Sequence, residues 1–142
     1  MHLTRFISII ASLFPLLAQA QEASAVIQVR AAYHNPVKPV TELFMADQSG
    51  AIVKLNLVAE GLSAPQLTLP TNGNLVLYTT AQVDPKKPEA SLAGSAKIPD
   101  GVKLATVVIF PAAKETDKPP YRLVIINDSP AEFKKGESRA IN

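Results

Sequence analysis

Few side chains in this sequence could perform acid–base or nucleophilic chemistry. His2 and His34 are the only histidines, and the chain has no cysteine. A hydrolytic serine needs a base beside it, and no Gly-x-Ser-x-Gly elbow is present to work with His34. Zinc is bound mainly by cysteine and histidine, so only carboxylates could complete a site around one histidine. We therefore interpret His34 as a loop residue after a strand, with no catalytic or metal-binding role.

The acidic residues lie mainly between apolar segments. Two carboxylates could hydrolyse a glycosidic bond, and several could bind calcium, but no Asp-x-Asp-x-Asp-Gly pattern supports a calcium site. Aspartate is also common in turns because its side chain bonds to nearby backbone groups. Turn positions are therefore the better interpretation of these acids: Asp47, Asp84, Asp100, Glu115, Asp117 and Asp128.

Three tyrosines are candidates for a carbohydrate-binding platform: Tyr33, Tyr78 and Tyr121. Tyr33 falls on the apolar face of its segment, and Tyr121 begins another apolar segment. Core packing with the hydroxyl at the rim is the better interpretation. Asn127-Asp128-Ser129 matches the N-glycosylation sequon, but it is explained more simply as a turn after a strand.

The first twenty residues have the order of a secretory signal peptide. Arg5 is followed by twelve residues from Phe6 to Leu17 that form an apolar stretch, and then by small residues that end at Ala20. A spanning helix needs roughly 20 apolar residues, so a stretch of twelve interrupted by Pro15 is too short. Cleavage is predicted between Ala20 and Gln21. A lipoprotein needs a cysteine there, so lipid anchoring by that route is excluded.

Composition restricts the partners of the predicted mature chain, residues 21–142. Loss of Arg5 leaves 13 lysines and arginines against 12 acids, which gives no large field to attract nucleic acid. The pairs at 86–87 and 134–135 are too short for a nucleic-acid patch. Without cysteine no disulfide can form, so the core alone must hold the fold. We expect no nucleic acid partner, no cofactor and no membrane span after cleavage.

Hydrophobic periodicity after residue 24 is two, which is typical of strands. The predicted strands are 27–33, 42–46, 51–58, a short one around 67–69, 75–80, 91–98, 104–110 and 121–127. Asp47 to Gly50 predicts a hairpin turn, and Gly94 indicates a bulged or edge strand. The runs 104–110 and 121–127 are the most apolar, so we expect both to be central. Turns at intervals of about ten residues predict one domain, an all-β immunoglobulin-like sandwich of about seven or eight antiparallel strands.

The chain ends with a loop anchored by Phe133 and a segment, Ser138 to Asn142, that begins like a strand. Such a strand is either a short edge or the start of a longer one, and we favour a truncated sequence. From Ile98 onward the chain resembles an uncharacterised family of short secreted β proteins found especially in Verrucomicrobia and related bacteria. The matching positions are Pro99, Gly101, Tyr121, Arg122, Phe133, Gly136, Arg139 and Asn142. The resemblance implies that another strand follows, but it implies no activity.

These observations predict a periplasmic or secreted protein without catalytic function. The leading hypothesis is a binding or structural module of the cell envelope that uses a loop cluster or a sheet edge, because strand addition is a common mode of peptide capture. One alternative is a carbohydrate-active or hydrolase accessory domain, in which two carboxylates, or His34 and a carboxylate, would converge in a pocket. A second alternative is a pilus-assembly-like periplasmic chaperone, although those proteins use two sandwich domains.

Overall fold

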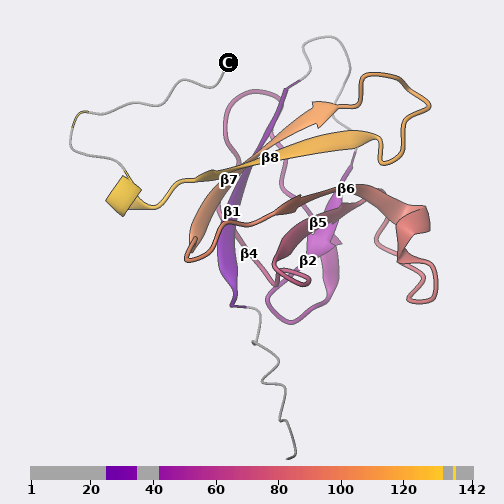
Figure 1. Ribbon diagram of the computed structural model, residues 1–142, viewed down its shortest axis with the longest axis horizontal. Helices are drawn as coiled ribbons and strands as arrows, with labels where there is room; N and C mark the ends of the chain where they lie inside the picture. The colour runs from indigo at the N-terminus through magenta and orange to yellow at the C-terminus, as the bar shows by residue number, and fades with distance from the viewer. Residues whose placement is uncertain (1–24, 35–41, 133–135, 137–142) are drawn as a thin grey trace, which may run out of the picture.

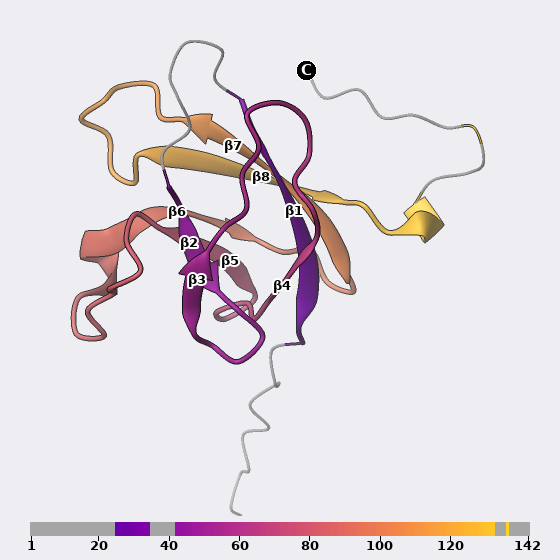
Figure 2. The same ribbon diagram turned by 180° about the vertical axis from the view of Figure 1, so that it is seen from behind.

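A computed structural model describes residues 25–34, 42–132 and 136 of the chain. These residues form eight strands and two short 3₁₀ helices: β1 Ile27–Tyr33, β2 Phe44–Ala46, β3 Ile52–Lys54, β4 Gln66–Thr68, β5 Asn74–Tyr78, η1 Pro88–Ser91, β6 Leu92–Lys97, β7 Leu104–Pro111, β8 Tyr121–Asn127 and η2 Pro130–Glu132. The strands make two four-stranded sheets, ordered β4-β1-β7-β8 and β3-β2-β5-β6 (Figure 1), and the view from behind shows β3 beside β2 (Figure 2). No helix in the described part of the chain is long and apolar enough to cross a membrane. The predicted all-β class is confirmed.

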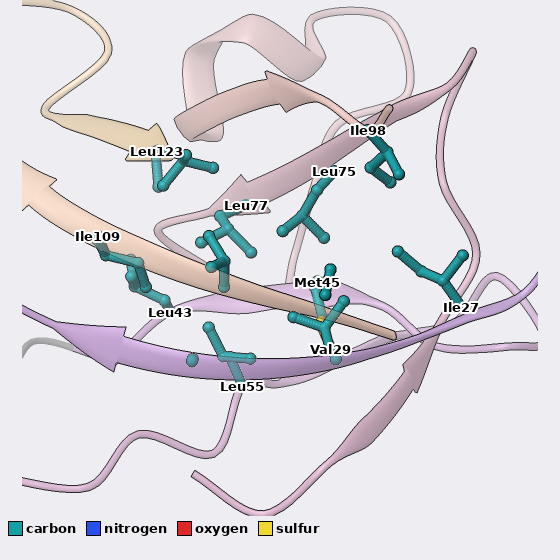
Figure 3. Close-up of a cluster of buried hydrophobic side chains, with 14 of the residues drawn as sticks. Ile27, Val29, Leu43, Met45, Leu55, Leu75, Leu77, Ile98, Ile109 and Leu123 are labelled. Atoms are coloured by element: carbon teal, nitrogen blue, oxygen red, sulfur yellow. The ribbon is translucent and has the colours of Figure 1, made fainter. Parts of the chain in front are cut away.

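The core lies between the two sheets because each sheet turns its alternate apolar residues inward. Ile27, Val29 and Ala31 of β1 are buried on the face that the period-two pattern predicted. Leucines and isoleucines of both sheets point into the same space (Figure 3). The residues of this cluster are Ile27, Val29, Ala31, Leu43, Met45, Leu55, Leu75, Leu77, Ala93, Ile98, Val102, Ala105, Val107, Ile109 and Leu123.

The expectation that all strands are antiparallel is wrong for one pair. β1 and β7 are parallel, with register from Gln28 opposite Leu104 to Tyr33 opposite Ile109. After β1 the chain builds all four strands of the second sheet and β4 of the first before it returns at β7 in the same direction as β1. Parallel neighbours need such a long crossover. Periodicity reports which face of a strand is buried, but it does not report the direction of its neighbours.

Only one of the two most apolar strands is central. In β7 every residue from Ala105 to Ile109 is buried, as predicted. β8 is instead the edge of its sheet, and Val124 on its outer face is 36% exposed. The prediction for β8 was wrong because a run of aliphatic residues is equally consistent with a central strand and with an edge strand that has one apolar face turned outward.

The short strand expected around residues 67–69 is present as β4, Gln66–Thr68. In this strand Leu67 is 41% exposed and Thr68 is buried. Burial of Thr68 is tolerated because its hydroxyl donates a hydrogen bond to the Ala46 carbonyl of the other sheet at 2.6 Å. The strand expected over 51–58 is limited to Ile52–Lys54, although Leu55 beyond it is still buried.

The region around Gly94 confirms both predictions made for it. β6 is an edge strand, and its register against β5 shifts between Leu77 and Tyr78, so that Ala93 has no partner of its own. A Cβ atom on Gly94 would lie 2.9 Å from the Tyr121 carbonyl oxygen. The missing side chain therefore lets β6 of one sheet approach the start of β8 of the other.

The residue types of Thr71-Asn72-Gly73-Asn74 predict a turn after β4, and the structure confirms it. Asn72 and Gly73 both have positive φ, 51° and 74°, as expected of a tight turn built from these two residue types. The signal peptide with its cleavage point between Ala20 and Gln21, the Phe133 anchor and the segment 138–142 lie outside the described residues.

Candidate functional site

Several of the polar residues considered from sequence bond to their own turns. Asp47 Oδ1 accepts hydrogen bonds from the Ser49 amide (2.7 Å), the Ser49 hydroxyl (2.6 Å) and the Ala51 amide (3.0 Å). These bonds, above all that of the Ser49 hydroxyl, lower the pKa of the Asp47 carboxyl. Asp84 and Asp117 accept from the amides of Lys86 and Lys114.

The sequon is also part of a turn. The Asn127 side-chain oxygen accepts from the Ser129 amide at 3.1 Å, the Asx-turn geometry expected after a strand. Across the described residues, no three histidines or acids are grouped closely enough to hold a metal ion.

His34 lies exposed just after β1, and its ring centroid is 5.3 Å from that of Phe110. Arg122 lies over the same Phe110 ring at 5.2 Å. The recorded ring contact of His34 is therefore with Phe110, which lies against Arg122 in turn. His34 does not line either of the two surface hollows described below.

The tyrosines pack largely as the sequence predicted. Tyr33 and Tyr121 are half-buried against the core, with ring centroids 6.2 Å apart in an edge-on contact. Tyr78 is half-buried on β5, on the opposite face from the buried Leu77. Two of the three rings therefore belong to the core rather than to an exposed platform.

The two sheets leave two open sides, and polar side chains close one of them. On the side of β3 and β4, Gln66 Oε1 accepts from the Asn56 amide at 2.6 Å, and Gln66 Nε2 donates to the Lys54 carbonyl at 3.1 Å. The Ser63 hydroxyl accepts from the Ala31 amide at 2.8 Å, and the Ser63 amide donates to the Ala31 carbonyl at 2.9 Å. The edge of β1 that extends beyond β4 is thus covered.

On the opposite side, β8 presents backbone groups away from its sheet. The Asp128 amide donates to the Leu104 carbonyl, and the Ala112 amide donates to the Pro120 carbonyl. In an antiparallel ladder the direction of the backbone groups alternates along the strand. The amides and carbonyls of the even-numbered residues of β8 therefore point toward β7, and those of the odd-numbered residues point away from the sheet. Within the described residues, no partner is recorded for the outward amide and carbonyl of Leu123 or Ile125.

β8 also lacks most of the devices that usually protect an edge, which include short length, bulges, proline and charged side chains, and its one charged residue is Arg122. β3 and β4 are three residues long, and β6 is bulged and ends at Lys97. β8 has seven residues in unbroken register with β7, and its sequence contains neither proline nor lysine. Of the edge strands in the described sheets, β8 is the one best suited to accept another strand.

The outer face of β8 carries a defined sequence of groups. Val124 and Ile126 form an apolar centre, with exposed Arg122 at one end and Asp128 just beyond the other. Asp128 Oδ2 accepts from the Thr106 hydroxyl at 3.0 Å and lies 4.0 Å from Arg30 Nη1. The Asp128 carboxylate is therefore held at the end of the strand through Oδ2, and its Oδ1 atom takes part in neither contact.

Two surface hollows flank this edge. One, of about 510 Å³, lies between β6 and the start of β8 and includes Ser95, Lys118, Arg122 and Leu123. The other, of about 680 Å³, lies near the opposite end, where Leu67, Leu104, Ser129 and Pro130 contribute to its wall. Both are open, and neither brings together the acid pair that glycoside hydrolysis would need.

No family model, no curated protein and no solved structure matches this chain. The β8 edge and the Thr106–Asp128 bond were not found from the sequence. No local signal marked the edge, since YRLVIIN places aliphatic residues on both faces of a strand. Among strands with such a pattern, only the pairing order of the sheet distinguishes an edge from a centre.

Proposed function

We propose that this chain is a non-catalytic module of the bacterial cell envelope, exported after cleavage between Ala20 and Gln21, that binds a partner protein by strand addition at β8. The fold that we propose for this module is an immunoglobulin-like β-sandwich. The resemblance of residues 98–142 to short secreted β proteins agrees with export. The observation that carries the binding proposal is the unprotected edge at Leu123 and Ile125.

Strand addition fits both the backbone and the side chains of β8. An incoming extended segment would bond to the outward amides and carbonyls, which supply affinity without regard to sequence. Its alternate side chains would meet the half-buried Ile125 on the inner side and Val124 with Ile126 on the outer side. A segment with apolar residues on both faces is therefore the expected ligand class.

A selection from a random peptide display library tests this proposal. The bait is the mature protein, and the counter-selection bait is Ile125→Pro, which removes one outward amide without removing an amide that faces β7. We expect enriched peptides rich in alternating aliphatic residues that bind the wild type and lose binding to Ile125→Pro. Peptides without this pattern, or with equal affinity for both baits, would contradict strand addition at β8.

The folding of the bait variant needs its own control. Val124→Pro removes an amide that donates toward β7, so it should lower stability much more than Ile125→Pro does. Circular dichroism of Ile125→Pro must show an intact sheet signal and a cooperative melt. Equal destabilisation by the two proline variants would mean that the orientation assigned to the β8 amides is wrong.

A further inference from the structure

We infer that the strand β8 accepts is β8 of a second copy of the same chain, antiparallel to it and related by a two-fold axis at Ile125. This inference rests on the proposed function, because it names the partner of the same edge. The eight strands of the two β8-containing sheets would then form one continuous sheet across the dimer. The order of side chains along β8 favours this pairing.

The backbone permits this register. Ile125 turns its amide and carbonyl outward, so two Ile125 residues placed opposite each other exchange both hydrogen bonds. Val124 then lies opposite Ile126 of the second copy, at a position where neither residue bonds across the interface. In antiparallel sheets, residues of that second type approach more closely, with Cα atoms about 4.5 Å apart.

The side chains are self-complementary in this register. Each outer face brings Val124 against Ile126 of the second copy, and this apolar pair occurs twice because of the symmetry. Arg122 lies opposite Asp128 of the second copy, and this oppositely charged pair also occurs twice. Cross-strand pairs of both kinds stabilise antiparallel sheets.

The neighbouring register is less favourable. An axis at Val124 also satisfies the backbone alternation, but it places Arg122 opposite Ile126 of the second copy and leaves the charge of Asp128 beyond the paired strands. An axis at Leu123 places Arg122 opposite Val124. Among these three registers, only the one centred on Ile125 brings the two charges of the outer face together.

Both charged groups are held in position before association. Arg122 is placed over the Phe110 ring, and no carboxylate in the described residues forms an ion pair with it. Asp128 is held through Oδ2 by Thr106 and lies near Arg30, which leaves Oδ1 to accept from the arginine of the second copy. Groups that are already ordered lose less entropy on binding.

A charge-exchange experiment tests the pairing by analytical ultracentrifugation. The mature wild type should form a dimer whose population rises with concentration. Arg122→Asp alone and Asp128→Arg alone place like charges opposite each other, and each should weaken self-association at least about tenfold. An equimolar mixture of the two variants restores both opposite-charge pairs, so a mixed dimer should form with affinity near that of the wild type.

Cysteine cross-linking tests the register, and the absence of native cysteine makes the result easy to interpret. Val124→Cys mixed with Ile126→Cys should give a disulfide-linked heterodimer, because a disulfide needs Cα atoms about 4.4 to 6.8 Å apart. Val124→Cys alone should link poorly, since its two copies would lie diagonally, about 7–8 Å apart. Efficient linkage of Val124→Cys alone would show the neighbouring register and overturn the inference.

The remaining outcomes separate this inference from the proposed function. A wild type that stays monomeric at all concentrations, while display selection yields Ile125-dependent peptides, would overturn self-association and leave strand addition standing. A dimer that is unaffected by either charge variant would also overturn the inference. Circular dichroism melts of each variant show whether a loss of association reflects unfolding, and the recovery in the mixture excludes that explanation for both.

Discussion

The two open sides of the sheet pair are closed in different ways. Along β3 and β4, the side chains of Gln66 and Thr68 bond from one sheet to the other, and Ser63 covers the edge of β1. Along β6 and β8, the sheets meet closely where Gly94 approaches the Tyr121 carbonyl. Past that contact, the outward backbone groups of Leu123 and Ile125 have no recorded partner in the described chain.

The edge strands of the two sheets differ in how well they are protected from pairing with another strand. Natural sheets protect edges that are not used, as the short β3 and β4 and the bulged β6 illustrate. A long, regular and apolar edge beside three protected ones therefore indicates an interface. Substitutions on the two sides of the sheet pair are expected to change stability by different amounts.

The largest effect is expected from Gly94→Val. Its side chain would collide with the backbone oxygen of Tyr121 and with the Leu123 side chain, so β6 and β8 must move apart. Overpacking of this kind costs about 2–3 kcal/mol, measured as the free energy of unfolding in urea. Ser95→Val adds a similar side chain at the adjacent exposed position and should change stability by less than about 0.5 kcal/mol. Equal effects would mean that the sheets do not depend on this contact.

A smaller loss is expected from Ser63→Ala on the opposite side. The variant leaves the buried Ala31 amide without its acceptor, which should cost about 1–2 kcal/mol of unfolding free energy. Hydrogen exchange of the Ala31 amide should rise in the variant relative to wild type. Ser95→Ala, which removes an exposed hydroxyl, serves as the control and should be near neutral. No change in Ala31 exchange would contradict the role of Ser63 as an edge cover.

A third test separates the contributions of the two Gln66 hydrogen bonds to stability. Gln66→Ala removes both and should lower the unfolding free energy by roughly 0.5–1 kcal/mol, because the bonds are exposed. Gln66→Glu keeps an acceptor for the Asn56 amide but places its second carboxylate oxygen against the Lys54 carbonyl oxygen, so it should be less stable than the wild type. A Gln66→Glu variant as stable as the wild type would show that the side chain does not connect the sheets as described.

The smallest effect concerns Asp47, in the turn between β2 and β3. Its pKa is lower in the folded chain than in the unfolded chain, so the charged carboxylate stabilises the turn above its ordinary pKa, about 4. This contribution is lost as the pH falls through the lowered pKa. The difference in melting temperature between wild type and Asp47→Ala should therefore be present at neutral pH and shrink in strong acid. A difference that grows in acid would contradict the sign.

The sequence predicted the buried faces and turns of the strands better than it predicted which strands pair with each other. Alternation identified the buried face of β1, while asparagine and glycine identified the turn at Asn72 and Gly73 and the irregularity at Gly94. Each of these features depends on local residue types. The parallel β1–β7 pair and the edge position of β8 depend on the order of strands in the sheet. Neither follows from periodicity, so the candidate site could not be found from sequence alone.

Residue-resolved hydrogen exchange in β8 tests the central claim most directly. The Ile125 amide points outward and the Val124 amide points toward β7, so the two adjacent residues serve as probe and control. In dilute protein we expect slow exchange at Val124 and fast exchange at Ile125, with Ile125 becoming protected as the protein concentration rises. Protection of Ile125 at the lowest concentration would mean that the edge is already paired within one chain, and fast exchange at every concentration would contradict self-association.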